Sequence, residues 1–385
     1  MKIFVCIPTY NEAENISSTI NAVLSEFEKI KNHEMNILVA DDTSPDKTYE
    51  IVEKIAKSNP RVHLLLNPNK IGIGGAYIKA MKYAMNDLKA DAVIELDADG
   101  QHKPSDIPRM VDLMDKENAE VVVGTRYIKG GKIPEEWGLK RKFFSVFGNM
   151  FARSVLWMWK YHDITTGFRL TKTSALKKVD LDNLISKQFA YKLHLYYALH
   201  KSGVKIVELP IEFVEREKGK SKITKKTLQE SMRVVLTLRY RENEKFFKVC
   251  VIGLIGFVIQ STGFNILRLT GMEPWWANTI AVEFAIISNY LLNNFWTFSA
   301  QRIGLKELTT LKIASLSIKI NAFFYKFILM NAVSLGSILI QAVLIYLGVR
   351  AFGKGFWIEN SLMIAGILIG LIWNFTMYKK VIWKK

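Results

Sequence analysis

The chain has 385 residues, with 53 lysine and arginine residues against 36 aspartate and glutamate residues, a formal net charge of +17. This length exceeds what one hydrophobic core usually holds, so we expect at least two domains. The positive charge predicts an anionic partner, either lipid head groups or phosphorylated substrates. Nucleic acid is disfavoured, because the sequence has no zinc-finger spacing, no RNA-binding aromatic signature and no basic helix free of acidic residues.

Residues 1–245 alternate short apolar runs, which predict strands, with helical patterns. Strands are expected at residues 2–8, 36–40, 62–66, 92–96 and 121–123, and helices from the first turn to about residue 31, at 47–57 and at 76–85. This order predicts an α/β domain with a doubly wound, mostly parallel sheet. The first apolar stretch is too short for a signal peptide, so we expect this domain in the cytoplasm.

From Phe246 onward apolar runs dominate, and four of them have roughly the 20 residues needed to span a bilayer. Basic residues gather after the second and the fourth of these runs, which by the positive-inside rule places both chain ends in the cytoplasm. The alternative, four buried helices of a soluble protein, is disfavoured by these basic flanks. We therefore expect a multi-pass protein of the cell membrane, with spans near 246–267, 277–298, 327–347 and 356–377.

Polar clusters follow four of the predicted strands, at residues 9–12, 41–46, 97–102 and 124–127. In doubly wound sheets, ligands bind at the carboxyl ends of the strands. Four segments that are separate in the sequence are therefore expected to meet at one edge of the sheet. This convergence is a stronger signal than any single motif.

Asp97, Asp99 and Gln101 place two carboxylates and an amide oxygen just beyond a predicted strand. Hard oxygen ligands at this spacing suit Mg²⁺ or Mn²⁺ bridging to a diphosphate. An Asp-x-Asp triplet also caps helices and shapes turns, and alone it does not decide between these two interpretations. Its position after a fourth parallel strand favours the metal.

Asp41 and Asp42 fit two interpretations that can hold together. They can form an Asx turn before the next helix, or one carboxylate can be free to bind a base or ribose while Ser44 and Asp46 cap that helix. The glycine-rich turn at residues 72–75 fits either a flexible connector or a close approach to phosphate, and we favour the connector.

These segments together resemble the family 2 glycosyltransferases, and within them the dolichol phosphate mannose synthases and polyprenyl phosphate glucosyltransferases. The C-terminal part is similar to the four-span GtrA-type membrane domain, chiefly through EFAIISNYLLNNFWTF at 283–298. The resemblance implies a GT-A domain at residues 1–245 and a GtrA-like domain with four spans at 246–385. The matching segments are IPTYNE at 7–12, DDTSPDKT at 41–48, DADGQHKP at 97–104, GTRYIKGG at 124–131, TTGFR at 165–169 and KGKSKI at 218–223.

The resemblance also implies roles for individual residues. Asp97, Asp99 and Gln101 would hold the metal, and Asp99, Arg126 and Arg141 would be catalytic. Arg126, Arg141 and Ser145 would bind the acceptor phosphate. The donor would be bound by Pro8, Tyr10, Glu12, Ala40, Asp42, Asp97, Ala98, Asp99, Gln101, Arg126, Arg216 and Lys222.

The implied reaction is transfer of a hexose from a nucleotide sugar to dolichyl or polyprenyl phosphate, with inversion at the anomeric carbon. A phosphate monoester is largely ionised at pH 7, because its second pKa is about 6, so the acceptor needs no catalytic base. We expect mannose from GDP-mannose. Two alternatives stay open: a UDP-glucose-dependent enzyme, because His194 stands where related sequences commonly have glutamate, and a transferase coupled to a flippase of the lipid-linked sugar.

Overall fold

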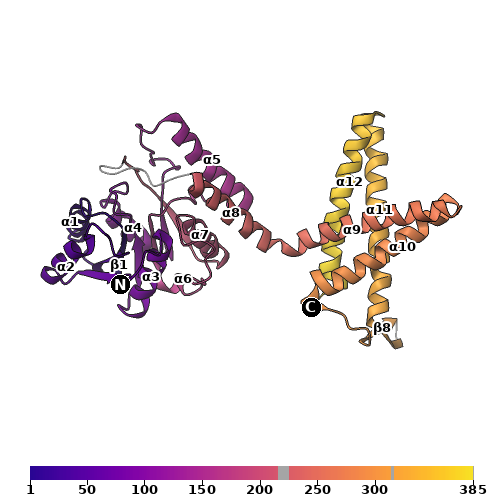
Figure 1. Ribbon diagram of the computed structural model, residues 1–385, viewed down its shortest axis with the longest axis horizontal. Helices are drawn as coiled ribbons and strands as arrows, with labels where there is room; N and C mark the ends of the chain where they lie inside the picture. Colours follow the sequence, from indigo (N-terminus) through magenta and orange to yellow (C-terminus); the bar gives the residue numbers. More distant parts are fainter. Residues whose placement is uncertain (216–224, 314–315, 385) are drawn as a thin grey trace. The chain divides into compact units, whose positions relative to one another are not determined.

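A computed structural model describes residues 1–215, 225–313 and 316–384 (Figure 1). The chain divides into two compact units, Met1–Arg239 and Tyr240–Lys385. The division lies close to the change in composition along the sequence. The domain boundary after residue 245 that we expect from that change remains a prediction.

The N-terminal unit is built on a seven-stranded sheet with the strand order β3-β2-β1-β4-β6-β5-β7. Neighbouring strands run parallel, except that β6 is antiparallel to both β4 and β5. The predicted α/β fold with a doubly wound, mostly parallel sheet is therefore confirmed. The strands are β1 (Lys2–Thr9), β2 (Glu34–Asp41), β3 (Val62–Leu66), β4 (Ala92–Glu95), β5 (Val121–Thr125), β6 (Arg169–Lys172) and β7 (Ile206–Pro210).

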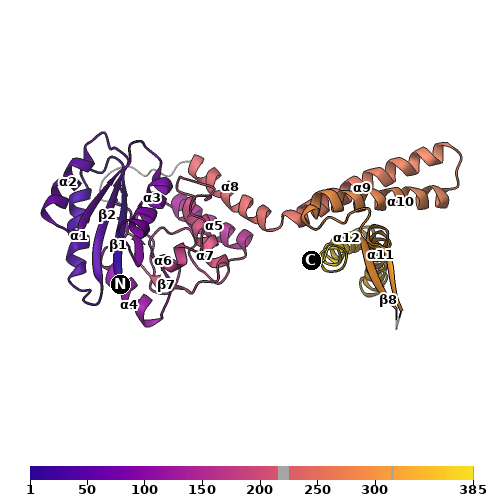
Figure 2. The same ribbon diagram turned by 90° about the horizontal axis from the view of Figure 1, so that it is seen from below.

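Helices cover both faces of this sheet, with α1 and α2 on one face and α3 on the other (Figure 2). In β1, Phe4 and Cys6 belong to one apolar core, while the alternate residues of the strand belong to the second core. A strand buried on both faces reads as a continuous apolar run, which is why the sequence predicts it well. The helices are α1 (Ile16–Phe27), α2 (Thr48–Ser58), α3 (Ile73–Asn86), α4 (Asp106–Lys116), α5 (Leu139–Leu156), α6 (Thr173–Leu176), α7 (Tyr191–Lys201) and α8 (Lys225–Glu242).

The strand order reverses at β1, which has β2 on one side and β4 on the other. From β1 the chain proceeds outward to β2 and β3, and it then returns to β4 on the opposite side. In open α/β sheets, a crevice for ligands forms outside the carboxyl ends of the strands at such a reversal. The segments that follow β1 and β4 begin at Tyr10 and Leu96, so the predicted metal ligands lie next to this crevice.

The C-terminal unit consists mainly of long apolar helices. Within the described part of the chain, three helices are long and apolar enough to cross a membrane: Glu244–Leu269, Ala322–Phe352 and Phe356–Ile382. The helix at the predicted second span, Pro274–Leu292, is not among them, so the count of four spans is not confirmed. The elements are α9 (Glu244–Leu269), α10 (Pro274–Leu292), β8 (Leu308–Ile313), β9 (Leu316–Asn321), α11 (Ala322–Phe352) and α12 (Phe356–Met377), with π-helical turns at Asn293–Thr297 and Tyr378–Ile382.

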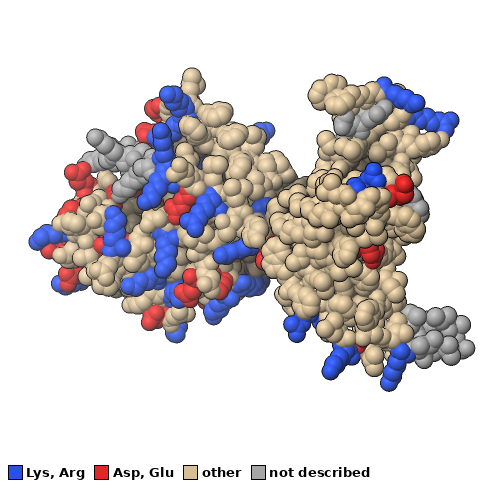
Figure 3. Space-filling model, turned by 45° about the vertical axis from the view of Figure 1, so that its right-hand side comes forward, with Lys and Arg blue, Asp and Glu red and all other residues tan. Residues whose placement is uncertain are grey.

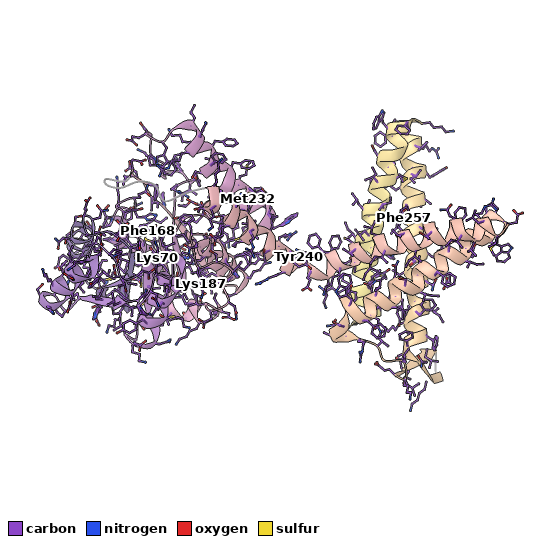
Figure 4. The ribbon with its side chains drawn as sticks, in the orientation of Figure 1. Lys70, Phe168, Lys187, Met232, Tyr240 and Phe257 are labelled. Carbon is purple, nitrogen blue, oxygen red and sulfur yellow. The ribbon has the colours of Figure 1, made fainter. Side chains whose placement is uncertain are left out.

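Large apolar side chains remain exposed on these helices. Phe257 on α9 is 65% exposed and Ile338 on α11 is 57% exposed (Figure 4). On the face shown in Figure 3, charged side chains are spread over the N-terminal unit, whereas the C-terminal unit is largely uncharged, with a few basic and acidic groups. Apolar helix surfaces of this kind suit contact with lipid acyl chains.

Asn294 organises the polar interior of the C-terminal unit. Its Nδ2 donates to the Ile303 carbonyl at 3.0 Å, and its Oδ1 accepts from the Ile303 amide at 2.9 Å and from Trp383 Nε1 at 3.0 Å. The Trp383 ring stacks on Phe298 with centroids 4.7 Å apart. A buried amide is stable only when its polar atoms are bonded, and this one meets that condition.

Candidate functional site

Pro8 and Ala40 are register partners at the carboxyl ends of β1 and β2, and both are buried. Beyond them, the ring of Tyr10 lies 3.5 Å from the ammonium of Lys70, which Figure 4 labels in the N-terminal unit. Glu12 accepts a hydrogen bond from Asn15 Nδ2 at 2.9 Å. The residues expected to bind the nucleoside thus come together at the end of these two strands.

The two carboxylates after β2 are both buried and both accept hydrogen bonds from the protein. Asp41 accepts from Thr9 Oγ1 at 2.7 Å and from the backbone amide of Ser44 at 2.7 Å, and the second bond closes a turn after β2. Asp42 accepts from Asn67 Nδ2 at 2.8 Å and from the amides of residues 71 and 72 at 3.0 and 3.2 Å. Asp42 therefore anchors the following loop. Its role toward the donor remains a prediction.

The glycine-rich turn is packed tightly, in contrast to the flexible connector that we expect from the sequence. Gly72 has a φ of 84°, and a Cβ there would lie 2.5 Å from Gln188 Nε2. A Cβ on Gly74 would lie 2.6 Å from the Gln188 carbonyl oxygen, and the amide of Gly75 donates to the carbonyl of Lys187 at 3.0 Å. These glycines allow the start of α3 to approach the backbone of residues 187–188.

Asp97 begins the predicted metal-binding turn after β4. Its Oδ1 accepts from the hydroxyl of Tyr77 at 2.8 Å, and its Oδ2 is 3.2 Å from Lys192 Nζ. Burial raises the pKa of the Asp97 carboxyl, but the positive charge of Lys192 together with the hydrogen bonds from Tyr77 and Lys192 helps to lower that pKa to about 2. The carboxylate is therefore ionised at neutral pH.

The remainder of this turn is held by one local hydrogen bond and by two from distant segments. Asp99 Oδ1 accepts from the amide of Gln101 at 3.1 Å, and Gly100 between them has a φ of 74°. The carbonyl of Ala98 accepts from Thr19 Oγ1 at 3.2 Å, and Gln101 Nε2 donates to the carbonyl of Val214 at 3.4 Å. Within residues 1–215, 225–313 and 316–384, no group of three or more His, Cys, Asp or Glu side chains could hold a metal ion. The candidate set instead combines two carboxylates with one amide.

His102 closes the turn against two aromatic rings. Its ring stacks on Phe168, labelled in Figure 4, and meets Phe213 edge-on, with centroids 5.0 Å apart in both cases. Burial lowers the pKa of His102 to about 3, against the opposing charge of Asp97. The imidazole is thus neutral at pH 7, and it ties the turn to the TTGFR segment and to the residues after β7.

Arg126, just after β5, is held by a buried carboxylate. Its Nε and Nη2 donate to Asp163 Oδ2 and Oδ1 at 2.7 and 3.0 Å, and Nη2 also donates to Thr165 Oγ1 at 2.9 Å. Burial raises the pKa of Asp163, but the charge of Arg126 and the hydrogen bonds from Arg126 and Thr165 together lower that pKa. A bidentate pair of this kind fixes the plane of the guanidinium.

Arg141 and Ser145 lie one turn apart on α5. Arg141 lies over the ring of Trp137 at 3.9 Å and pairs with Glu215 at 3.0 Å. The hydroxyl of Ser145 shares a hydrogen bond of 2.7 Å with the hydroxyl of Tyr127. Trp137 packs in turn on Phe213.

Phe213 joins the turn at residues 97–102 to these basic residues. Its ring meets His102 at 5.0 Å and lies 5.3 Å from the guanidinium carbon of Arg126. Arg126 also lies 5.1 Å from the ring of Tyr127, the partner of Ser145. The structure thus brings the turn at 97–102 together with what we call the acceptor cluster: Arg126, Tyr127, Arg141 and Ser145. Arg216 and Lys222 lie outside the described residues.

One face of α5 is apolar and exposed beside the acceptor cluster. Phe143, Phe147 and Met150 are exposed on this helix, and the rings of Phe143 and Phe147 stack at 5.5 Å. Trp157 and Trp159 are exposed directly after the helix. An exposed apolar patch of this kind marks a surface for a protein, a ligand or a membrane.

Residues 4–180 match the model of the family Glycosyl transferase family 2, and residues 248–383 match the model GtrA/DPMS, transmembrane domain. An undecaprenyl-phosphate mannosyltransferase of Micrococcus luteus is 35% identical over 58% of this chain and 88% of its own length. A dolichol-phosphate mannosyltransferase of Pyrococcus furiosus is 31% identical over 86% of this chain and 91% of its own. This chain belongs to glycosyl transferase family 2.

The chain is therefore a glycosyltransferase joined to a GtrA/DPMS membrane domain, as the sequence motifs predict. A polyprenol monophosphomannose synthase of Mycolicibacterium smegmatis is 34% identical over 60% of this chain and 84% of its own length. Among solved structures, glucosyl-3-phosphoglycerate synthase from Mycobacterium tuberculosis superposes with a TM-score of 0.44 at 16% identity, over 61% of this chain and 79% of that one. The two family models and the relatives confirm family membership and the presence of a membrane domain.

Two contributors to the site escape sequence reasoning. Asp163, the partner of Arg126, lies two residues before the TTGFR segment, and Lys192, the partner of Asp97, lies within an ordinary helical pattern. Each pairs with a residue far away in the sequence, so neither residue stands out by spacing. The nearest signal is Gly167 in the middle of TTGFR, because Lys192 lies against it.

Proposed function

We propose that this protein transfers a mannosyl residue from GDP-mannose to the phosphate of a dolichol or another polyprenol, with inversion at the anomeric carbon. The observation that carries this proposal is the junction of a carboxylate turn and a basic cluster at one edge of the sheet, made through Phe213. The three relatives are polyprenyl or dolichol phosphate mannosyltransferases, which supports mannose as the sugar.

The donor side would use the crevice between β1 and β4. Pro8, Tyr10, Glu12, Ala40 and Asp42 would surround the nucleoside, at the ends of adjacent strands. Ala98, buried within the turn at residues 97–102, would line the donor pocket near the diphosphate. Arg216 and Lys222, which lie outside the described residues, are proposed as further contacts to the donor phosphates.

Asp97, Asp99 and Gln101 fit a divalent cation, since two carboxylates and one amide supply hard oxygen ligands within a single turn. The low pKa of Asp97 keeps that carboxylate ionised. We propose Mg²⁺ or Mn²⁺ as the ion, which when bound would neutralise charge on the departing diphosphate. Asp99, as a ligand that touches this ion, is the proposed catalytic carboxylate.

The acceptor cluster would bind the lipid phosphate. The negative charge of this phosphate would be balanced by Arg126, which Asp163 orients, and by Arg141, which packs on Trp137. The Ser145 hydroxyl would donate a hydrogen bond to the phosphate. The phosphate oxygen attacks without a catalytic base, so the side chains position the acceptor and balance charge. The exposed apolar face of α5 offers the adjoining isoprenoid chain a surface.

The proposed orientation places the catalytic unit and both chain ends on the cytoplasmic side. Its support is the distribution of Lys and Arg in the segments between and after the apolar helices. A panel of radiolabelled GDP-mannose, UDP-glucose and UDP-N-acetylglucosamine with short polyprenyl phosphates tests the function. We expect product only with GDP-mannose, and product only with another donor would refute the mannose assignment.

A further inference from the structure

Lys192 is a buried lysine within the candidate donor site. Its side chain is 2% exposed, and Nζ lies 3.2 Å from Asp97 Oδ2 and 4.5 Å from the ring of Phe189. Lysine is almost never fully buried unless its charge is paired, so this position requires the carboxylate of Asp97. The first proposed metal ligand thus already has a cationic partner within the protein.

Gly167 makes room for this ammonium group. A Cβ built on Gly167 would lie 2.1 Å from Lys192 Nζ and 2.4 Å from its Cε, which is too close for any real side chain. The glycine in the TTGFR segment and the lysine on α7 are therefore matched to each other. The ammonium occupies a place that the backbone leaves open beside Asp97.

The positive charge of Lys192 opposes a second cation at the same carboxylate. The carboxylate of Asp97, one of the two proposed carboxylate ligands, is already balanced by the lysine. A divalent ion that binds here without a nucleotide meets a repelling ammonium a few ångströms away. A diphosphate brings the additional negative charge that would accommodate both cations.

We propose that Lys192 is a positioning residue that acts as the resident counter-ion of Asp97, so that the divalent ion binds tightly only together with the donor diphosphate. This inference rests on the proposed function, since it takes Asp97, Asp99 and Gln101 as ligands of the metal. The ammonium keeps Asp97 neutralised and in place while the metal is absent. The lysine thereby couples metal binding to nucleotide binding.

The test measures the affinity of the full-length protein in detergent for Mn²⁺ by electron paramagnetic resonance. The measurement is made with and without GDP. We expect weak binding to the wild-type protein without nucleotide, and binding that is at least roughly tenfold tighter in Lys192→Gln. The gain from adding GDP should be smaller in this variant than in the wild type. Tighter metal binding is a gain that loss of structure cannot produce.

Lys103→Gln is the matched control, since it removes a positive charge from the segment just after the same turn, where Lys103 pairs with Glu212 at the surface. We expect this control to change Mn²⁺ affinity less than about twofold, because an exposed charge is screened. Gly167→Ala is a second test, which displaces the ammonium while retaining its charge. It should tighten Mn²⁺ binding in the same direction as Lys192→Gln.

Thermal unfolding identifies which variants are folded. If Lys192→Gln is not folded, Mn²⁺ binding to Gly167→Ala tests the role of Lys192. Unchanged Mn²⁺ affinity in the folded variants overturns the role of Lys192. Failure of the proposed function looks different. A wrong donor nucleotide removes the effect of GDP but leaves the nucleotide-free comparison intact, whereas absence of Mn²⁺ binding in wild type and variants alike, even with GDP, refutes the metal site itself.

Discussion

The guanidinium of Arg126 donates two nearly parallel hydrogen bonds to Asp163, from Nε at 2.7 Å and from Nη2 at 3.0 Å. Asp163 is fully buried and Arg126 is nearly so. The pair therefore sets the direction in which the arginine faces the site. Such bidentate geometry cannot be reproduced by the single ammonium of a lysine.

We expect Arg126→Lys to lower kcat/KM for the polyprenyl phosphate by roughly tenfold to a hundredfold, the range for loss of a charge-assisted hydrogen bond. Steady-state kinetics with the acceptor varied measure the change. Arg109→Lys is the control, because Arg109 also pairs with an aspartate, Asp106, but is half exposed on α4. The same kcat/KM for the polyprenyl phosphate in both variants would show that the bidentate geometry of Arg126 is unimportant for the reaction.

The metal assignment predicts the behaviour of Asp99→Asn. Loss of one charged oxygen ligand should reduce turnover by at least about tenfold, because the ion must offset diphosphate charge. Wild-type activity should vanish with a chelator and return with Mg²⁺ or Mn²⁺. Asp112→Asn, at an exposed position on α4, should leave turnover unchanged. Full activity in excess chelator would rule out the metal.

The compactness of the N-terminal unit predicts that a fragment of residues 1–241 folds alone and binds GDP. Circular dichroism and calorimetry measure these two properties. Transfer to long polyprenyl phosphates should fall much more than transfer to short soluble acceptors, because the fragment lacks the long apolar helices. Equal losses for both acceptors would argue against a recruiting role of the membrane domain.

His102 predicts a pH dependence of the stability of this fragment. Its pKa is lowered to about 3 in the folded protein, mainly by burial, against about 6.5 for a free imidazole. The unfolded chain takes up the proton first, so stability is fully present above about pH 6.5 and is lost as pH falls toward 3. This contributes at most about 1.4 kcal/mol per pH unit to the free energy of unfolding.

Urea unfolding between pH 7.5 and about 5 measures this slope, above the range in which most carboxylates titrate. We expect His102→Gln to have a shallower slope than the wild type, because glutamine takes up no proton. His162→Gln is the control, since His162 is a half-exposed histidine of the same unit. Identical slopes for wild type and His102→Gln would mean that the buried imidazole is not kept neutral.

The sequence predicts most of the parallel sheet, because strands buried on both faces are apolar without interruption, as β1 is. The chain leaves the buried sheet at the end of each strand, so a polar cluster follows the apolar run and marks the strand end in the sequence. The antiparallel strand β6 has no such signature, since its four residues include Arg169, which is buried against Glu95. A short strand that contains a charged residue is therefore not recognised from a run of apolar residues.

The sequence predicts those site residues whose type is required by the motifs. It predicts less well the residues that are required only because the fold packs them against the site. Asp97 and Arg126 belong to motifs, but their partners Lys192 and Asp163 lie 95 and 37 residues away along the chain. Only the fold brings these charges together. The prediction of a flexible connector at residues 72–75 is wrong for the same reason. The backbone of residues 187–188, whose close approach requires glycine there, is remote in sequence.

Arg141 supplies the most specific prediction for the acceptor. Its guanidinium lies 3.9 Å from the centre of the Trp137 ring and 3.0 Å from a carboxylate oxygen of Glu215, so its position is fixed without being buried. Ser145 lies four residues later, on the same side of α5. This places a cation and a hydroxyl side by side, next to the exposed apolar face of the helix.

We expect Arg141→Ala to raise KM for the polyprenyl phosphate by roughly tenfold to a hundredfold, because a charged hydrogen bond to the phosphate is lost. The KM for GDP-mannose should change little, since this arginine is assigned to the acceptor alone. Lys140→Ala removes an exposed charge from the neighbouring position of α5 and should leave both constants near wild type. Steady-state kinetics with each substrate varied separately measure both values. An unchanged acceptor KM in Arg141→Ala would make this residue an ordinary surface charge, and an equal rise in both KM values would assign it to the donor diphosphate instead.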